Sequence, residues 1–262
     1  MITYSEDGTL AAGLAGKATG VRSSLDTVVK EPEAKAGFVA TVVIPAYNEE
    51  KGLPVVLERL SRSVDGQAEV LVVDDGSSDA TSQVASRFRC GVIRHGRNRG
   101  KGEAMLTGIR HARGGSVIFI DADGTYPPEA IPQMLQALES YEAVYCSRTK
   151  GRENIPRMNQ LGNALFQSFM KYVYGFRGSD YATGLYGIRK CHLESMNVRS
   201  RGFAIEPEIA IKASRMKLKV CEIPIQYEER IGETKLNGLK AGWLHLKVMV
   251  SLASWRPRRD SV

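Results

Sequence analysis

Short, predominantly apolar runs alternate four times with helix-like segments between residues 39 and 140. The runs are residues 40–44, 68–73, 90–93 and 116–120. Their apolar residues are consecutive or nearly so, which is typical of strands covered on both faces. Each run is followed by apolar residues at helical spacing, as at Leu53, Val56 and Leu60. This order predicts an α/β fold in which a mostly parallel sheet carries helices on both faces.

Three polar clusters follow these runs. They are the sequence PAYNEE at 45–50, the acids Asp74 and Asp75, and the acids Asp121 and Asp123. In open sheets of this class the binding crevice lies beyond the carboxyl ends of the strands. We therefore expect the three clusters to converge on one crevice.

The acids Asp121 and Asp123 are separated by Ala122 and follow directly on the run 116–120. Carboxylates beside a buried strand are costly unless something positive meets them. One interpretation is a divalent metal site, because oxygen ligands suit Mg²⁺ or Mn²⁺ and such a metal would clamp a pyrophosphate. The other is an Asx-type turn before Gly124 that holds no ligand.

Two further segments suit a nucleotide or a phosphate. VVDDGSSDAT (72–81) fits either hydrogen bonding to a nucleoside or a turn with a helix cap. NRGKGEA (98–104) is glycine-rich and basic like a phosphate-binding loop, but it also fits a plain helix entry. No GxGxxG follows the first strand and no GxxxxGK[ST] is present, which argues against dinucleotide-binding and P-loop sites.

The bulk properties set broad limits. The chain has 262 residues and a net charge of +7, which fits a protein that handles phosphates, nucleic acid or an anionic membrane surface and does not choose among them. Its four cysteines are far apart, so we expect reduced thiols. No segment resembles a membrane span or a secretory signal. We expect a flexible extension at 1–36, the main domain at 37–240, and an amphipathic helix with a basic tail at 241–262.

The C-terminal segment has two interpretations. It carries Trp243 and Trp255 among other apolar residues and ends in Arg256, Arg258 and Arg259. A helix of this composition can lie in a membrane interface. It can equally be an ordinary helix that closes the domain and ends in a frayed tail.

A series of motifs occurs in the order found in family 2 glycosyltransferases of the GT-A fold. The motifs are VVIPAYNEE, VLVVDDGSSDAT, NRGKGEAMLTGIRHARG, FIDADGTYPPEAIPQM and CSRTKG. The downstream sequences TGLYGIRK, GFAIEPEI and EIPIQYEERIGETKLNGLKAG are similar to the dolichyl-phosphate mannosyltransferase and polyprenyl-phosphate glycosyltransferase branch. The resemblance covers roughly residues 39–245. It implies a GT-A, Rossmann-like fold.

The resemblance also implies a nucleotide-sugar site. Pro45, Tyr47 and Glu49 match positions that hold the nucleoside base. Asp75 matches the residue that hydrogen-bonds the base or the ribose. We place Lys101, from the basic loop 98–104, in the same binding site.

The resemblance makes Asp121 and Asp123 the metal-binding pair, with the backbone of Ala122 close to the ribose. The implied cofactor is a divalent ion, Mg²⁺ or Mn²⁺. Two residues after the second acid this branch usually has Gln, and this chain has Thr125.

The basic residues on the phosphate side come next. Arg148 matches a residue near the transferred phosphates, and Arg230 and Lys235 match the pair that grips phosphate over the active site. Glu206 and Glu208 are expected on the acceptor side, as a base or as groups that orient these cations. The alternative for the two glutamates is a solvated or salt-bridged helix start, where negative charge is favourable.

The implied activity is inverting transfer of a hexose, mannose or glucose, from a nucleotide sugar to polyprenyl or dolichyl phosphate. A lipid phosphate is already anionic near pH 7 and needs cations, whereas a sugar hydroxyl needs a carboxylate base within about 3 Å. The alternatives are a glycosyltransferase for a soluble or glycan hydroxyl and a non-catalytic nucleotide-binding subunit. We expect a cytoplasmic protein, free or peripheral at the inner membrane face, with a homo-oligomer or a membrane subunit as further partners and no nucleic acid.

Overall fold

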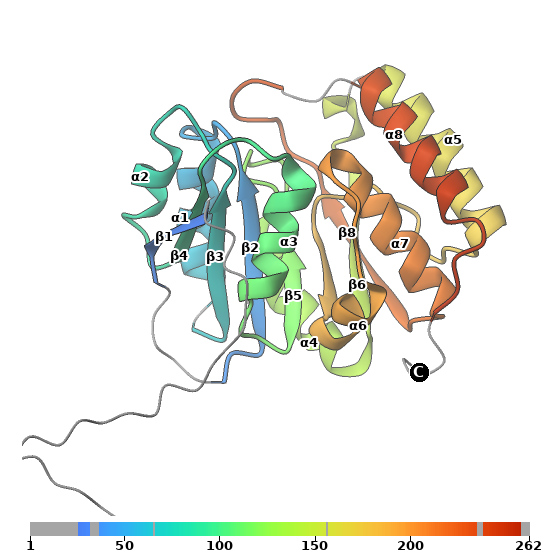
Figure 1. Cartoon of the computed structure of the whole chain (residues 1–262), viewed down its shortest axis with the longest axis horizontal. Coiled ribbons are helices and arrows are strands. Elements are labelled where there is room, and N and C mark those ends of the chain that lie inside the picture. Colours follow the sequence, from blue (N-terminus) through green and yellow to red (C-terminus); the bar gives the residue numbers. More distant parts are fainter. Residues whose placement is uncertain (1–25, 32–36, 65, 156, 235–237, 258–262) are drawn as a thin grey trace, which may run out of the picture.

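The computed structural model describes residues 26–31, 37–64, 66–155, 157–234 and 238–257 (Figure 1). The strands are β1 (Asp26–Lys30), β2 (Ala40–Ala46), β3 (Ala68–Asp74), β4 (Gly91–His95), β5 (Ser116–Phe119), β6 (Ala143–Lys150), β7 (Tyr186–Arg189) and β8 (Val220–Gln226). The α-helices are α1 (Gly52–Ser63), α2 (Thr81–Ala85), α3 (Lys101–His111), α4 (Ile131–Ser140), α5 (Arg157–Tyr174), α6 (Lys190–Met196), α7 (Ile205–Arg215) and α8 (Gly238–Ser251). Short 3₁₀ helices are η1 (Pro128–Ala130), η2 (Arg152–Asn154) and η3 (Gly202–Ala204).

One sheet of eight strands runs through the molecule in the order β1-β4-β3-β2-β5-β7-β6-β8. The strands β4, β3, β2 and β5 pair in parallel, as the alternation of apolar runs and helical segments predicts. Beyond β5 the sheet is mixed, because β7 lies antiparallel to both β5 and β6 while β6 and β8 are parallel. The predicted α/β class is confirmed, and its regular half ends at β5.

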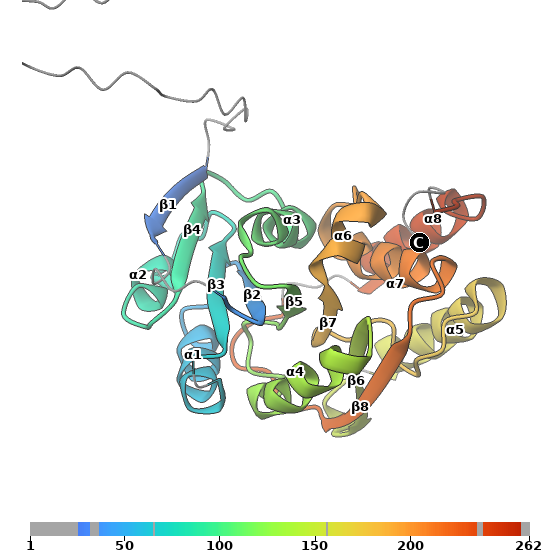
Figure 2. The ribbon, with the colours of Figure 1, turned by 90° about the horizontal axis from the view of Figure 1, so that it is seen from below.

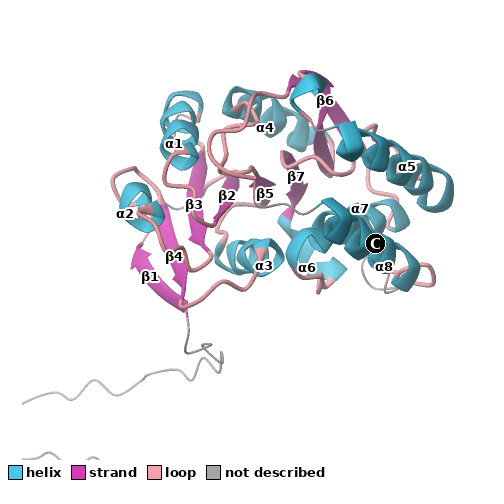
Figure 3. Cartoon of the chain, turned by 90° about the horizontal axis from the view of Figure 1, so that it is seen from above, coloured by secondary structure: helices cyan, strands magenta, loops and turns pink. Residues whose placement is uncertain are grey.

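Helices cover both faces of this sheet. The helices α1 and α4 lie on one face, and α3, α6 and α7 lie on the other (Figures 2 and 3). Successive side chains of β2 enter different cores, since Val43 packs with the α3 and α7 side and Ile44 packs with the α1 and α4 side. A strand that is buried on both faces is apolar at most positions, which explains the nearly continuous runs.

The central strand β2 ends two residues later than its proline suggests. The sequence predicts that Pro45 stops the strand at Ile44, but β2 continues to Ala46. The pairing of β2 with β5 covers only residues 40–43 of β2. Pro45 therefore lies beyond the end of that pairing, where its missing N–H costs no ladder hydrogen bond.

The N-terminal segment is more ordered than predicted. Within the expected flexible extension, β1 pairs antiparallel with β4, from Asp26 opposite His95 to Lys30 opposite Val92. Lys30 donates to the carbonyl oxygen of Ser86 at 3.2 Å. The expectation of flexibility was wrong for this strand, because a short weakly patterned segment gains its order from the neighbouring edge. Residues 1–25 and 32–36 lie outside the described part of the chain.

The predicted C-terminal helix is α8, which begins at Gly238, before the expected boundary at 241. It lies beside α5 at the end of the molecule beyond α7 (Figure 1). In the described residues, no helix combines the length and the apolar character needed to cross a membrane.

Packing of α3 on β2 depends on a glycine. A Cβ atom at Gly108 would lie 2.2 Å from Cγ1 of Val43. We expect Gly108→Ala to lower the free energy of unfolding by about 1–3 kcal/mol, because this contact overpacks the core. Urea denaturation measures the change.

The control is Gly115→Ala, since a Cβ there meets only the Val39 carbonyl oxygen at 3.6 Å. In the Gly108→Ala background, Val43→Ala should cost less than it does alone, because it makes room for the new methyl group. Equal costs in both backgrounds would contradict this packing.

Candidate active site

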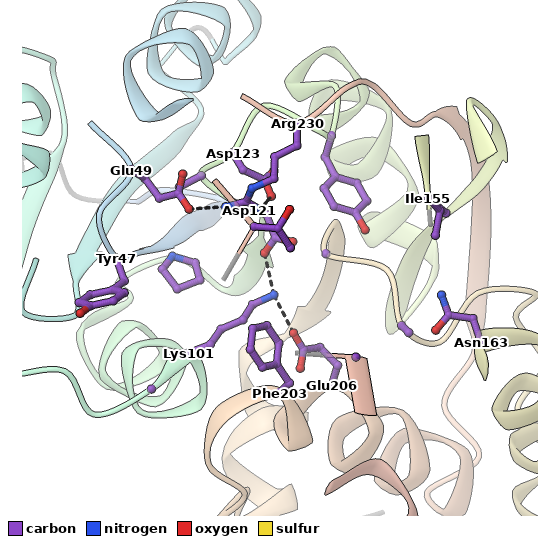
Figure 4. Close-up of a pocket in the computed structure, with 18 of the residues that line it drawn as sticks. Tyr47, Glu49, Lys101, Asp121, Asp123, Ile155, Asn163, Phe203, Glu206 and Arg230 are labelled. Atoms are coloured by element: carbon purple, nitrogen blue, oxygen red, sulfur yellow. Dashed lines mark hydrogen bonds and ion pairs between the residues drawn. The ribbon is translucent and has the colours of Figure 1, made fainter. Parts of the chain in front are cut away.

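A pocket of about 880 Å³ lies at the carboxyl ends of β2, β3 and β5 and extends between α5 and α8 (Figure 4). The three polar clusters expected at one crevice all reach it. The predicted site residues that line it are Pro45, Tyr47, Glu49, Asp75, Lys101, Asp121, Ala122, Asp123, Arg148, Glu206 and Arg230. Of the other two, Glu208 lies away from the pocket, and Lys235 is outside the described residues.

Lys101 joins two carboxylates at the centre of the pocket. Lys101 is the first residue of α3. Its Nζ lies 2.7 Å from Oδ1 of Asp121 and 2.8 Å from Oε1 of Glu206. Burial alone would lower the pKa of Lys101, but the two carboxylates hold it above its usual value. The lysine is therefore a fixed positive charge that links the end of β5 to the start of α7.

Arg230 forms a second bridge on the other side of the pocket. Its guanidinium donates to Asp123 and, at 2.6 Å, to Oε1 of Glu49 (Figure 4). The segment after β8 is held there by its backbone, since the N–H of Ile231 donates to the carbonyl oxygen of Asp123 at 2.9 Å. Gly124 has a φ of +79° and a Cβ there would approach Ile231, so a glycine suits this close crossing.

Thr125 stands where the resembling branch usually has Gln, and it contacts Asp123. Its hydroxyl donates to Oδ1 of Asp123 at 2.6 Å, and its backbone N–H donates to the same oxygen at 3.1 Å. The Asx-type turn considered from the sequence is thus present. It orients the carboxylate that also meets Arg230.

Asp121 is confined by its surroundings. A Cβ atom at Gly184 would lie 2.2 Å from Oδ2 of Asp121, so only glycine leaves room for the carboxylate. Burial raises the pKa of Asp121 to about 6, with Lys101 opposing the rise and Asp123 adding to it. Burial therefore disfavours the ionised form of Asp121, and the positive charge of Lys101 offsets part of that cost.

Asp121 and Asp123 are the pair that could hold a divalent metal. No group of three or more His, Cys, Asp or Glu side chains with metal-ligand spacing occurs among the described residues. Two carboxylates nevertheless fit Mg²⁺ or Mn²⁺ when phosphate oxygens and water complete the coordination. In this structure Asp121 pairs with Lys101 and Asp123 pairs with Arg230, and these cations balance the negative charge of the two acids.

Asp75 makes three hydrogen-bond contacts within the protein. Its Oδ1 faces Nδ1 of His95 at 2.7 Å and accepts the N–H of Arg99 at 2.9 Å, and its Oδ2 accepts the N–H of Gly100 at 2.7 Å. The carboxylate therefore fixes the loop that leads into Lys101. These hydrogen bonds explain why an acid lies beside the glycine-rich segment in space, without reference to any ligand.

Arg148 lines the pocket but its charge is neutralised nearby. Its Nε and Nη2 pair with the two oxygens of Asp180 at 2.6 and 2.7 Å, and Nη2 also reaches the carbonyl oxygen of Ala182. Its guanidinium also lies over the ring of Tyr227 at 5.5 Å. The structure thus gives Arg148 a place in the pocket wall.

The two glutamates of α7 point to different places. Glu206 reaches the pocket through Lys101, and its Oε2 is buried with no hydrogen-bond partner. Glu208 accepts the N–H groups of Arg199 and Ser200 and pairs with Lys212, away from the pocket. Burial would raise the pKa of Glu208, but Lys212 and Ser200 bring it below its usual value, so it is an ionised anchor for the loop before α7.

The sequence did not predict that His245 links α8 to the wall of the pocket. Nε2 of His245 lies 2.8 Å from the Phe203 carbonyl oxygen, and Nδ1 lies 3.1 Å from the hydroxyl of Tyr181. Burial lowers the pKa of His245, so the ring is neutral, donates to Phe203 and accepts from Tyr181. The ring of Phe203 lies 5.8 Å from Nζ of Lys101. A single histidine in an apolar segment gave no signal for this role.

Gly184 was also missed as a site residue. It belongs to the motif TGLYGIRK, whose position suggested family membership but not contact with Asp121. The contact is created by the antiparallel entry of β7 beside β5, which a sequence pattern of parallel strands does not reveal.

Comparisons with known proteins identify the family of this chain. The family described as "Glycosyl transferase family 2" matches residues 41–196. A dolichyl-phosphate hexose transferase of Haloferax volcanii is 34% identical over 203 residues, which are 77% of this chain and 88% of the relative. A dolichol-phosphate mannosyltransferase of Pyrococcus furiosus is 30% identical over 234 residues, and the match spans 85% of this chain and 66% of that protein.

Solved structures share the fold. Glucosyl-3-phosphoglycerate synthase from Mycobacterium tuberculosis, crystallised with Mn²⁺, uridine diphosphate and glucosyl-3-phosphoglycerate, has a TM-score of 0.67 and 22% identity. The similarity covers 85% of this chain and 82% of that one. It confirms the GT-A architecture.

The ionisation of Asp121 can be measured directly. With a folded pKa of about 6 against an ordinary value of 3.8, the folded state binds this proton more tightly than the unfolded state. Ionisation of Asp121 therefore costs stability as the pH rises from about 4 to 6. We expect a carboxyl ¹³C resonance in labelled protein to titrate near pH 6.

Lys101→Met should move this midpoint upward, because it removes the nearest positive charge. Lys217→Met, at an exposed lysine, is the control and should leave it unchanged. A midpoint near 4 in the unmodified protein would contradict the burial of this carboxylate.

Proposed function

The chain belongs to glycosyl transferase family 2 and is a glycosyltransferase, and we propose that it moves a hexose from a nucleoside diphosphate sugar to polyprenyl phosphate. Its relatives from Haloferax volcanii and Pyrococcus furiosus are named for dolichyl phosphate acceptors, and one from Micrococcus luteus is named an undecaprenyl-phosphate mannosyltransferase. The observation that carries the proposal is a pocket that has two carboxylates at the strand ends and is also lined by residues of α5 and α8.

The donor would bind at the strand ends. We assign the nucleoside to Pro45, Tyr47 and Ala122, which line the pocket beside β2 and β5. Asp75 remains a proposed contact to the base or ribose, held in place by His95 and the loop before α3. This leaves the diphosphate next to Lys101 and the acidic pair.

We assign the divalent metal to Asp121 and Asp123. When bound, it would supply positive charge for the leaving diphosphate. The relative of known structure from Mycobacterium tuberculosis holds Mn²⁺ together with uridine diphosphate, which supports a metal of this class. Lys101 would stay near the diphosphate, because Glu206 holds its other side at 2.8 Å.

The proposed reaction is a single displacement with inversion. An oxygen of the acceptor phosphate forms a bond to the anomeric carbon as the bond from that carbon to the donor phosphate breaks. The electron pair leaves with the nucleoside diphosphate, where cations stabilise it. The acceptor phosphate is already ionised near pH 7 and needs no base.

Arg230 is our principal candidate for gripping the acceptor phosphate. It is a cation at the pocket on a segment outside the sheet, and it can exchange Asp123 and Glu49 for phosphate oxygens. Lys235 follows on the same segment and stays a proposed partner. Arg148 is instead assigned to the wall, through Asp180.

Glu206 supports one alternative acceptor. Its buried Oε2 has no hydrogen-bond partner, so it could receive a proton from a sugar hydroxyl. With a phosphate acceptor, Glu206 would only orient Lys101. A soluble or glycan hydroxyl acceptor therefore stays the second candidate, and Glu206→Gln would abolish that activity while sparing transfer to phosphate.

The proposed acceptor also bears on location. Polyprenyl phosphates lie in membranes and nucleotide sugars are water-soluble, so we propose that the protein works at the cytoplasmic face of a membrane. The described residues contain no spanning helix, and so contact would be peripheral or through a membrane subunit.

Transfer of label into the organic phase tests the function. A panel of radiolabelled guanosine and uridine diphosphate hexoses is incubated with polyprenyl phosphate and Mg²⁺ or Mn²⁺. We expect one donor to give an organic-phase product and Asp123→Asn to lower its rate by at least about 100-fold, because a metal ligand is lost. Glu58→Gln, at an exposed side chain on α1, is the control.

Label that stays in the aqueous phase with every donor would exclude the lipid acceptor. The same panel with sugar acceptors would then test the second candidate.

Gly184→Ala tests the link between β7 and the acidic pair. The new methyl group would displace the Asp121 carboxylate and would also lie 2.7 Å from the ring of Tyr126, so we expect transfer to fall by at least about tenfold and the melting temperature to fall as well. Rates and melting temperatures are measured in parallel with Gly115→Ala. Unchanged transfer by Gly184→Ala would show that the position of Asp121 is not critical.

A further inference from the structure

Arg59 on α1 binds two glutamates that lie far from it in the sequence. Its Nη1 and Nη2 donate to the two oxygens of Glu228 at 2.9 and 2.7 Å. Its Nε and Nη2 donate to the two oxygens of Glu129 in η1, also at 2.9 and 2.7 Å. The planar guanidinium thus makes a two-pronged contact with each carboxylate, a geometry that a lysine cannot reproduce. We call these contacts the outer brace, because its three residues are not among those that line the pocket.

The outer brace repeats a connection that Arg230 makes inside the pocket. Arg230, two residues after Glu228, pairs with Glu49 just before α1 and with Asp123 just before η1 (Figure 4). The outer brace likewise reaches α1, through Arg59 itself, and η1. The segment after β8 is therefore joined twice to the same two parts of the chain, once inside the pocket and once outside it.

Between these two contacts, the backbone of the segment crosses the loop that carries Asp123. The N–H of Glu228 donates to the carbonyl oxygen of Thr125, and the N–H of Ile231 donates to that of Asp123, both at 2.9 Å. The segment therefore lies directly against the loop of the acidic pair. A shift of this segment would move the guanidinium of Arg230 relative to that pair.

The outer brace adds more to position than to stability. The side chains of Arg59, Glu129 and Glu228 are 23%, 54% and 38% exposed, and partly exposed ion pairs have small net effects on stability. The hydrogen bonds from Arg59 lower the pKa of Glu129, so this carboxylate is ionised at neutral pH. The two forks nevertheless restrict where the segment after β8 can lie.

We propose that Arg59 is a positioning residue, which keeps the segment after β8 in place while Arg230 exchanges its carboxylate partners for the phosphate of the acceptor. This role rests on the proposed function, in which Arg230 releases Glu49 and Asp123 to bind phosphate. Without the outer brace, the exchange would leave the segment held by its backbone hydrogen bonds, which fix the guanidinium less closely. Arg59 touches no reacting group and acts through Glu228.

Steady-state transfer assays test this role. Arg59→Met should raise the KM for polyprenyl phosphate at least about tenfold and leave the KM for the donor unchanged, because the lost group positions the arginine that binds the acceptor. Arg59→Lys keeps the charge but not the fork, and it should show most of the same defect. Arg62→Met is the control, because it breaks an exposed pair with Glu58 within the same helix.

A double-mutant cycle separates positioning from a general effect on folding. In the Arg230→Met background, Arg59→Met should change transfer no further, because the group that it positions is absent. All variants should keep nearly the wild-type melting temperature. A further loss of equal size in that background would show that Arg59 acts elsewhere and would overturn the proposal.

Amide hydrogen exchange tests the outer brace without any substrate. The amides of Glu228 and Ile231 should exchange at least about tenfold faster in Arg59→Met than in the wild type, because the segment opens more readily, and Arg62→Met should leave them unchanged. Unchanged exchange in Arg59→Met would overturn the outer brace. A wild type that transfers no hexose to polyprenyl phosphate would instead overturn the proposed function, and faster exchange in Arg59→Met would still support the brace.

Discussion

Negative charge at the carboxyl ends of buried parallel strands is the constraint on which this structure depends. β2, β3 and β5 deliver Glu49, Asp75 and the pair Asp121 and Asp123 to one rim, where none would be tolerated without a partner. Glu49 and Asp123 share Arg230, and the other two acids have partners of their own. Asp75 receives backbone amides and a histidine, Asp121 a lysine from α3, and Asp123 an arginine from beyond β8. Among these partners, Arg230 is the one that comes from the irregular half of the fold.

This arrangement has a consequence for ligand binding. Lys101 and Arg230 already neutralise the acidic pair, so a divalent ion alone would compete with two positioned cations. A nucleoside diphosphate brings its own negative charge and gives those cations a new partner. Under the proposed function, the joint binding of metal and donor would therefore be favoured over the binding of either one alone.

The sequence predicted the regular half of the fold well. Continuous apolar runs specify strands buried on both faces, and acids at their ends specify the rim, so the positions of Asp121, Asp123 and Lys101 followed from pattern and motif. The predictions were weaker where contacts arise from the mixed half of the sheet. No periodic pattern in the sequence indicates that Gly184 lies close to Asp121 or that Arg148 pairs with Asp180. Glu206 and Glu208 are two residues apart on one helix, and the helical turn sends them to opposite surroundings.

The short strand β1 has a practical meaning for anyone who trims the chain to its catalytic portion. Asp26 pairs with Arg99 at 2.7 Å, and Arg99 lies in the loop whose backbone holds Asp75. Removing everything before the family match would uncover the edge of β4 and take away one of the two carboxylates with which Arg99 pairs. An exposed strand edge invites pairing between molecules. A shortened protein should therefore begin before Asp26, and an N-terminal purification tag should be attached before that residue as well.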